Sequence, residues 1–119
     1  MSQPIPVVLA EHIRAVNAFD TEAIVRTFAA DALVNDNRRE IVGTEAIRRW
    51  VDKEITGDKV TMEIREVIDH YGLTIIRARY DGLFDKTKLP PELTLSNYFT
   101  VRNERITSLI IVFNQSSPY

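Results

Sequence analysis

The spacing of apolar residues changes once along the chain, from helical in the first half to alternating in the second. Leu9, Ile13 and Val16 recur three or four positions apart, which predicts a first helix that ends near residues 17–18. Asp20 follows, and its side chain can accept a hydrogen bond from the free amide groups that begin a helix. We therefore expect a second, short helix directly after the first.

A third helix is predicted after two short extended pieces at residues 33–36 and 40–42. Gly43 precedes this helix, Thr44 is expected to cap it, and Gly57 is placed to end it. Its apolar positions recur at helical spacing and should form a buried stripe. These positions are Ile47, Trp50, Val51 and Ile55. The first half of the chain is therefore predicted to be mainly helical.

The second half is predicted to form strands, because apolar and polar residues alternate along it. Val60, Met62 and Ile64 alternate with polar neighbours and should lie on the buried face of one strand. The alternation slips at residues 66–68, where we expect a bulge. A tight turn at residues 71–72 then leads into a second strand, so the two strands should form a hairpin.

Two further strands, residues 93–101 and 106–114, are predicted to pair across a short turn. Residues 85–92 carry too many charges and prolines for a strand and should form an exposed loop. Three helices against a strongly curved antiparallel sheet of about four long strands make an α+β fold, a cone with an open mouth. We expect the whole chain, residues 1–119, to be one such domain.

The composition narrows the classes of function. The chain has no cysteine, which excludes disulfides and thiolate metal sites, and its formal charge of −2 gives no electrostatic reason to bind nucleic acid. Its only two histidines, His12 and His70, do not stand at metal-ligand spacing. No apolar run reaches the length of about 20 residues that crosses a bilayer. A cytosolic protein that binds neither membrane nor metal is expected.

Four motifs, taken in order, resemble a known group of proteins. They are NAFD at 17–20, FAADALVND at 28–36, GTEAIRRW at 43–50 and the final strand pair at 99–109. Over nearly the whole chain, the sequence resembles the nuclear transport factor 2-like superfamily, in particular its SnoaL-like polyketide cyclase and ketosteroid isomerase branch. The resemblance implies a cystatin-like cone around one pocket, on which this superfamily builds many activities.

Three polar residues are implied as catalytic by this resemblance. Related isomerases carry their proton-shuttling aspartate at the end of a run similar to residues 28–36, which corresponds to Asp36. Their donor tyrosine aligns with His12, and their neutral acid aligns with Asn97. Abstraction of a proton next to a carbonyl needs a carboxylate base, and the enolate needs hydrogen-bond donors. The three residues could therefore support isomerase or cyclase chemistry without any cofactor.

The substrate of such chemistry would be a small apolar molecule. Asn97 lies on the apolar face of its predicted strand, where a polar group must be satisfied by protein, water or ligand. Apolar side chains from the third helix and the strands are expected to wall the pocket. They are Trp50, Met62, Ile64, Phe99 and Phe113.

The same three polar residues also have purely structural explanations. Asp36 could bond the amides of its turn or pair with Arg38 or Arg39. His12 could lie at the surface or at the edge of the core, and Asn97 could bond a neighbouring backbone group. In that case the cone would be a non-catalytic module that binds a ligand or another protein.

A second polar group lies on one face of the second long strand and consists of Arg77, Arg79 and Asp81. Arg79 and Asp81 resemble the arginine and aspartate of limonene epoxide hydrolases in the same superfamily. The third acid of those enzymes aligns with Ile111, so an essential group is missing. Alternating charges next to charged residues of a neighbouring strand more often form a solvated face than a catalytic site.

The last strand is apolar on both faces, which favours a position at the centre of the sheet or beneath a second subunit. The stripe of Leu109, Ile111 and Phe113 would otherwise leave an exposed apolar patch. Members of the superfamily often form dimers. Together with that resemblance, the apolar stripe predicts a homodimer through the outer face of the sheet.

Overall fold

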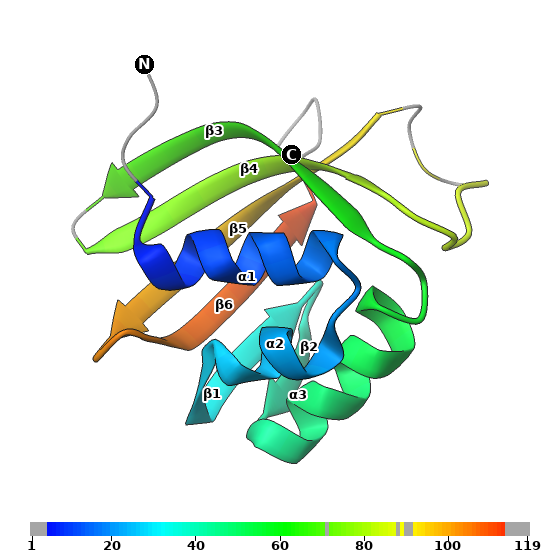
Figure 1. The fold of residues 1–119 in the computed structure, drawn as a ribbon. Helices are drawn as coiled ribbons and strands as arrows, with labels where there is room; N and C mark the ends of the chain where they lie inside the picture. The colour runs from blue at the N-terminus through cyan, green and yellow to red at the C-terminus, as the bar shows by residue number, and fades with distance from the viewer. Residues whose placement is uncertain (1–4, 71, 88, 90–91, 114–119) are drawn as a thin grey trace.

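The computed structural model describes residues 5–70, 72–87, 89 and 92–113, and it packs helices against the concave face of a curved sheet (Figure 1). The helical elements are α1 Val7–Asn17, α2 Thr21–Arg26, α3 Thr44–Trp50 and the π-helical η1 Val51–Ile55, which continues α3. The strands are β1 Phe28–Asp36, β2 Arg39–Val42, β3 Thr61–His70, β4 Leu73–Asp81, β5 Leu93–Arg102 and β6 Arg105–Phe113. The predicted α+β cone is confirmed.

The six strands form one sheet in the order β2-β1-β6-β5-β4-β3. Four of the five neighbouring strand pairs are antiparallel and the fifth, β1 with β6, is parallel, so the sheet is mixed rather than purely antiparallel. The parallel pair arises because β1, from the helical half of the chain, adds to the free edge of the last strand. This brings Asp36 next to Ile111 and therefore joins the two halves of the chain.

Bulges add to the curvature of the sheet. The register between β3 and β4 shifts between Ile64 and Glu66, slightly before the predicted slip at 66–68. Extra residues on one strand increase local twist and bend the strand. The predicted hairpin is confirmed by the pairing of β3 with β4, although Tyr71 of its turn lies outside the described residues.

The helix termini follow local side-chain chemistry, with one correction. Asp20 accepts a hydrogen bond from the amide of Ala23 at 3.1 Å and caps α2 as predicted. Thr44, by contrast, does not cap α3, because its hydroxyl donates to the carbonyl oxygen of Ala30 at 3.4 Å. Gly43 occupies the cap position with φ +87°, a conformation that glycine adopts without steric cost.

The core fills the space between α1, α3 and the concave face of the sheet. Leu109 and Ile111 of β6 point into it and are buried, so the outward stripe that was predicted from these two residues is wrong. The alternate residues Ile110 and Val112 point outward instead and are 41% and 42% exposed. β6 lies between β1 and β5 inside the sheet, which accounts for its apolar character on both faces.

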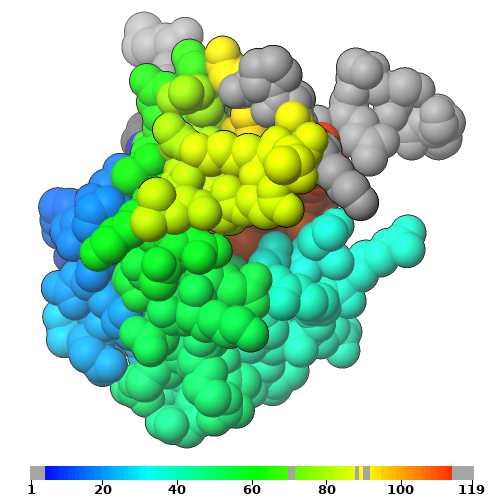
Figure 2. Space-filling view, turned by 90° about the vertical axis from the view of Figure 1, so that its right-hand side faces the viewer, coloured from blue at the N-terminus to red at the C-terminus, as the bar shows by residue number. Residues whose placement is uncertain are grey.

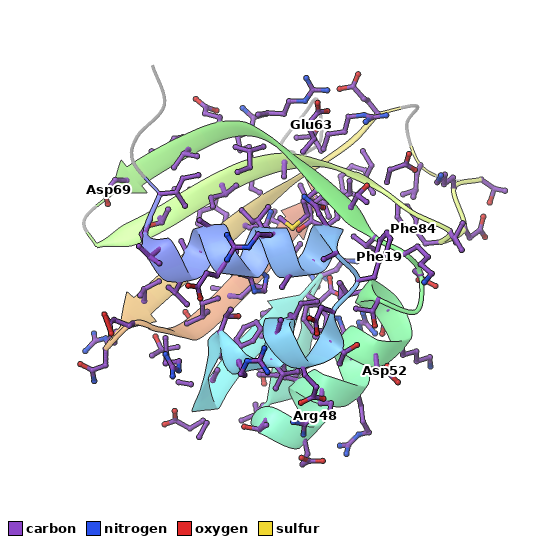
Figure 3. The ribbon with its side chains drawn as sticks, viewed as in Figure 1. Phe19, Arg48, Asp52, Glu63, Asp69 and Phe84 are labelled. Atoms are coloured by element: carbon purple, nitrogen blue, oxygen red, sulfur yellow. The ribbon has the colours of Figure 1, made fainter. Side chains whose placement is uncertain are left out.

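The segment between β4 and β5 contains no strand in its described residues, 82–87, 89 and 92, as the sequence predicts. Residues 88, 90 and 91 of the predicted loop lie outside the described residues. Phe84 belongs to this segment and lies beyond the end of β4, on the side of η1 (Figure 3). The loop therefore contributes an apolar side chain at one end of the cone.

Candidate functional site

Two adjoining cavities lie between the helices and the sheet. The empty space is about 310 Å³ at the inner chamber and about 540 Å³ at the mouth chamber, and both volumes include space that is open to solvent. Five side chains line both chambers: Trp50, Ile55, Val60, Tyr80 and Ile111. Only the inner chamber is lined by His12, Val16, Ile24, Met62, Asn97 and Leu109. Only the mouth chamber is lined by Asp36, Glu54, Asp58, Phe84, Leu93 and Leu95.

The mouth is visible as a hollow in the surface (Figure 2). Its rim consists of the segment after β4, of η1 and of the β1–β2 hairpin, and β6 is visible at its base. A molecule that occupies the cavity would enter from this side.

Asp36 stands at the end of β1, and its carboxylate lines the mouth. Its Oδ2 accepts hydrogen bonds from Trp50 Nε1 at 3.1 Å and from Arg39 Nη2 at 2.7 Å. Its Oδ1 has no hydrogen-bond partner among the described residues, and the side chain is 22% exposed. One carboxylate oxygen is thus held by two donors, while the other can accept from a molecule in the cavity.

Arg39 connects the β1–β2 hairpin to η1. Its Nη1 and Nη2 donate to the two carboxylate oxygens of Glu54 at 2.8 and 2.7 Å, and Nη2 also binds Asp36. The bond to Glu54, with a smaller contribution from Asp36, raises the pKa of Arg39 above its ordinary value. Arg39 in turn lowers the pKa of Glu54. The pairing of Asp36 with Arg39 that the sequence left open is therefore present.

His12 comes from α1 and lines the inner chamber, with only 4% of the residue exposed. Its Nδ1 lies 3.0 Å from the Thr27 hydroxyl, and its ring meets the rings of Phe28 and Phe99 edge-on at 5.4 and 5.6 Å. Burial lowers the pKa of His12 to about 4. The imidazole is therefore neutral at physiological pH, and His12 is a wall of the cavity rather than a surface residue.

Asn97 of β5 and Tyr80 of β4 form a hydrogen-bonded pair. The Tyr80 hydroxyl donates to Asn97 Oδ1 at 2.6 Å, and Asn97 Nδ2 donates to the carbonyl oxygen of Ile76 at 3.1 Å. Burial raises the pKa of Tyr80 and the negative charge of Asp36 adds to this, whereas the bond to Asn97 opposes it. The phenol therefore stays protonated and can act as a donor.

Tyr80 was missed by reasoning from sequence, although a signal was present. It stands between Arg79 and Asp81, which were assigned to one face of their strand. Because side chains alternate along a strand, the intervening residue points to the opposite face. That face is the concave one, so Tyr80 lines both chambers.

The predicted apolar walls are only partly found around the two chambers. Trp50 lines both chambers and Met62 lines the inner one. Ile64, Phe99 and Phe113 line neither of them. Phe99 is fully buried and supports the ring of His12, while Ile64 packs against the core from a partly exposed position.

Arg77, Arg79 and Asp81 do not line the inner chamber or the mouth. Arg79 lies 3.7 Å from Glu63, which points away from α1 on the outer side of the sheet (Figure 3). Asp81 binds Lys86 at 2.7 Å. The group that resembles an epoxide hydrolase pair thus forms ion pairs outside the two chambers.

Comparison with known proteins identifies the family. The SnoaL-like domain family matches residues 9–109, which is most of the chain. The chain belongs to the SnoaL-like family. No curated protein matches this SnoaL-like domain.

Solved structures share the fold of this SnoaL-like domain. A Sinorhizobium meliloti protein, provisionally assigned as a polyketide cyclase, is 29% identical over 90% of this chain and 94% of its own, with a TM-score of 0.79. A Catenulispora acidiphila protein with a ketosteroid isomerase-like fold, in complex with trimethylamine, is 24% identical over 96% and 90%, with a TM-score of 0.76. A Mycobacterium tuberculosis protein in complex with estradiol-17beta-hemisuccinate is 18% identical over 91% and 92%, with a TM-score of 0.77.

In the part of the SnoaL-like domain that the structure describes, no three His, Asp or Glu residues are grouped so that they could hold a metal ion. No helix within the described ranges has the length and apolar character needed to cross a membrane. The cytosolic location expected from the sequence stays a prediction.

Proposed function

We propose that the two chambers together bind one small, largely apolar molecule that carries a carbonyl group. Asp36 is proposed to be a general base that abstracts a proton from the carbon next to this carbonyl group. The observation that carries this proposal is the placement of Asp36, whose Oδ1 is free to accept a proton while Oδ2 is held by Trp50 and Arg39. Such fixed geometry favours proton transfer, because the base is already oriented when the substrate enters.

Tyr80 is proposed as the donor to the oxygen that becomes negatively charged. When Asp36 removes the proton, the electron pair of the C–H bond moves toward the carbonyl oxygen and forms an enolate. The protonated Tyr80 hydroxyl lines both chambers and is near enough to Asp36 for their charges to interact. It would turn from Asn97 to the enolate oxygen, and Asp36 would return the proton to the α-carbon, or to the γ-carbon of a substrate whose C=C bond is conjugated with the enolate.

The structural neighbours support a small-molecule ligand. The Mycobacterium tuberculosis protein holds a steroid ester and the Catenulispora acidiphila protein holds trimethylamine, each in the same overall fold. Both ligands are small and carry apolar groups, as expected for a cavity whose shared walls are mainly apolar side chains. Their chemistry differs, so they support binding of a small molecule rather than one particular substrate.

The proposal is tested by the exchange of solvent deuterium into a panel of enolisable ketones and lactones. Asp36→Asn should lose exchange by a factor of at least about 100, because an amide cannot accept the proton. Glu54→Gln is the matched control, since Glu54 also lines the mouth and also binds Arg39. It should retain most of the exchange. Equal activity of the native protein and Asp36→Asn would contradict the role of Asp36.

A second candidate function is binding of a ligand without catalysis. It is favoured by Asn97, whose amide already donates to the carbonyl oxygens of Ile76 and Leu95 and whose oxygen already accepts from Tyr80. The donor role implied for Asn97 by the resemblance would therefore require breaking one of these hydrogen bonds. Saturable binding of panel compounds without any deuterium exchange would favour this second function.

We also propose that the domain forms a homodimer through the outer face of the sheet. A row of outward side chains crosses four neighbouring strands at paired positions: Ile68, Ile75, Tyr98 and Ile110. Ile68 and Ile110 are well exposed, at 37% and 41%. A continuous apolar row on an outer sheet face is typical of a surface that a second subunit covers.

A further inference from the structure

The hydroxyl group of Thr27 fixes the position of a proton on His12. Thr27 Oγ1 lies 2.6 Å from the carbonyl oxygen of Ile24 and 3.0 Å from His12 Nδ1. Two oxygens approach to 2.6 Å favourably only when a proton lies between them, so the hydroxyl donates to Ile24. A hydroxyl has a single proton, and Nδ1 must therefore supply the proton of the second hydrogen bond.

The other ring nitrogen then carries a lone pair. His12 is neutral at physiological pH, and a neutral imidazole with its proton on Nδ1 has an acceptor at Nε2. Nε2 has no hydrogen-bond partner among the described residues. Among the described residues, every fully buried side-chain nitrogen or oxygen has a hydrogen-bond partner. Nε2 has none, so it is not fully buried and must be open to the chamber that His12 lines.

The other polar groups of the inner chamber are already bonded. The Tyr80 hydroxyl gives its proton to Asn97, and the Asn97 amide donates to the carbonyl oxygens of Ile76 at 3.1 Å and of Leu95 at 3.5 Å. The remaining walls specific to this chamber are the apolar side chains of Val16, Ile24, Met62 and Leu109. A ligand that reaches this end therefore meets one polar atom without any hydrogen bond, His12 Nε2, and that atom accepts rather than donates.

We propose that the inner chamber recognises a hydroxyl group, which donates to His12 Nε2, and that the ligand is an apolar molecule with an alcohol at its inner end. This inference rests on the proposed occupancy of the cavity by a small molecule and adds the chemistry of one end of that molecule. A carbonyl oxygen in the same place would face a lone pair and lose its hydrogen bond to water without replacement. The donor role that resemblance implies for His12 is thereby replaced by an acceptor role.

The tautomer can be tested without any ligand. Nitrogen-15 spectra of the His12 ring at pH 7 should show a protonated Nδ1 and an unprotonated Nε2. Assignment is simplified by a His70→Gln background, because His12 and His70 are the only histidines of the chain. A ring with its proton on Nε2 would overturn the inference even if the cavity binds small molecules.

The preference for a hydroxyl group is tested with 2-tetralol and 2-tetralone, which differ in bearing an alcohol or a ketone. The native protein should bind the alcohol about 10 to 100 times more tightly, the range expected when one buried hydrogen bond is lost. Thr27→Val removes the acceptor for Nδ1, lets the ring proton move to Nε2, and should abolish or reverse this preference. Thr107→Val is the control, since the Thr107 hydroxyl donates to a carbonyl of β5 instead.

Three outcomes would overturn the inference in distinguishable ways. Equal affinity of the native protein for both compounds would exclude recognition by an acceptor. An unchanged preference in Thr27→Val would show that the Thr27 hydroxyl does not control the ring. Binding of neither compound would overturn the proposed occupancy of the cavity, and this inference with it. The deuterium-exchange test of Asp36 is separate, because it concerns the reaction alone.

Discussion

At the residue scale, the cavity depends on polar groups that are buried but hydrogen-bonded. Asn97 is 1% exposed, yet it bonds both Tyr80 and the backbone of Ile76. His12 is similarly buried and is held by Thr27. Unpaired groups of this kind would destabilise the fold by about 1–3 kcal/mol each. Their hydrogen bonds allow polar chemistry to exist inside an apolar core.

Burial of His12 predicts a dependence of stability on pH. Its pKa is lowered from 6.5 to about 4 in the folded protein, so the unfolded chain binds the proton first as the pH falls. The contribution of His12 is therefore complete above pH 6.5 and is lost as the pH falls from there toward 4. Two proteins are compared, His70→Gln and the double variant that also carries His12→Gln. Between pH 7 and pH 5, the free energy of unfolding of His70→Gln should fall by about 2 kcal/mol more than that of the double variant.

Chemical denaturation at several pH values measures this difference. The comparison with His12→Gln removes the effect of the carboxylates, because both proteins contain the same acidic residues. Parallel pH profiles of the two proteins would show that His12 has an ordinary pKa and is not sealed in the core.

At the scale of the elements, η1 places two walls of the cavity. Trp50 precedes it and Ile55 ends it, and both side chains line the two chambers. π-Helical turns are frequent at functional sites because they change the direction of side chains within a continuing helix. The element is followed by Gly57, where the chain passes close to its own backbone.

Gly57→Ala should destabilise the domain by about 1–3 kcal/mol, the usual cost of overpacking. A Cβ at this position would lie 2.5 Å from the carbonyl oxygen of Asp52 and 2.6 Å from that of Lys53. Gly72→Ala is the comparison, because its φ is +82° but no atom lies within 4 Å of the added Cβ. It should cost only about 1 kcal/mol, from backbone strain. Denaturation midpoints that rank the two variants in the opposite order would contradict this account.

Most elements and their order could be predicted from the sequence, because they depend on local periodicity and capping, but β1 begins at Phe28 instead of the expected residue 33. Asp20 as a cap and the hairpins are examples. The parallel pairing of β1 with β6 could not be predicted, because it joins segments distant in the chain. Within the site, Asp36 and Asn97 were found through resemblance and strand alternation. The Tyr80–Asn97 bond and the role of Thr27 depend on distances that no local pattern determines.

At the scale of the whole molecule, the two faces of the sheet are proposed to have different functions. The concave face holds the cavity, and the outer face carries the apolar row that is proposed to bind a second subunit. Ile110→Lys should therefore convert a dimer to a monomer, because it places a charge in the centre of that row. Sedimentation velocity measures the change. Val42→Lys is the control, because Val42 is exposed on edge strand β2, and this variant should remain dimeric. A native protein that sediments as a monomer would refute the proposed interface.

The central claim is that one small molecule occupies the cavity between Asp36 and His12, and Trp50 reports on it most directly. Trp50 is the only tryptophan of the chain, lines both chambers and donates its indole N–H to Asp36. The indole N–H resonance of Trp50 should therefore be shifted in Asp36→Asn and should move saturably when 2-tetralol is added to the native protein. A ligand that binds while this resonance stays unchanged would place the binding site elsewhere and contradict the account.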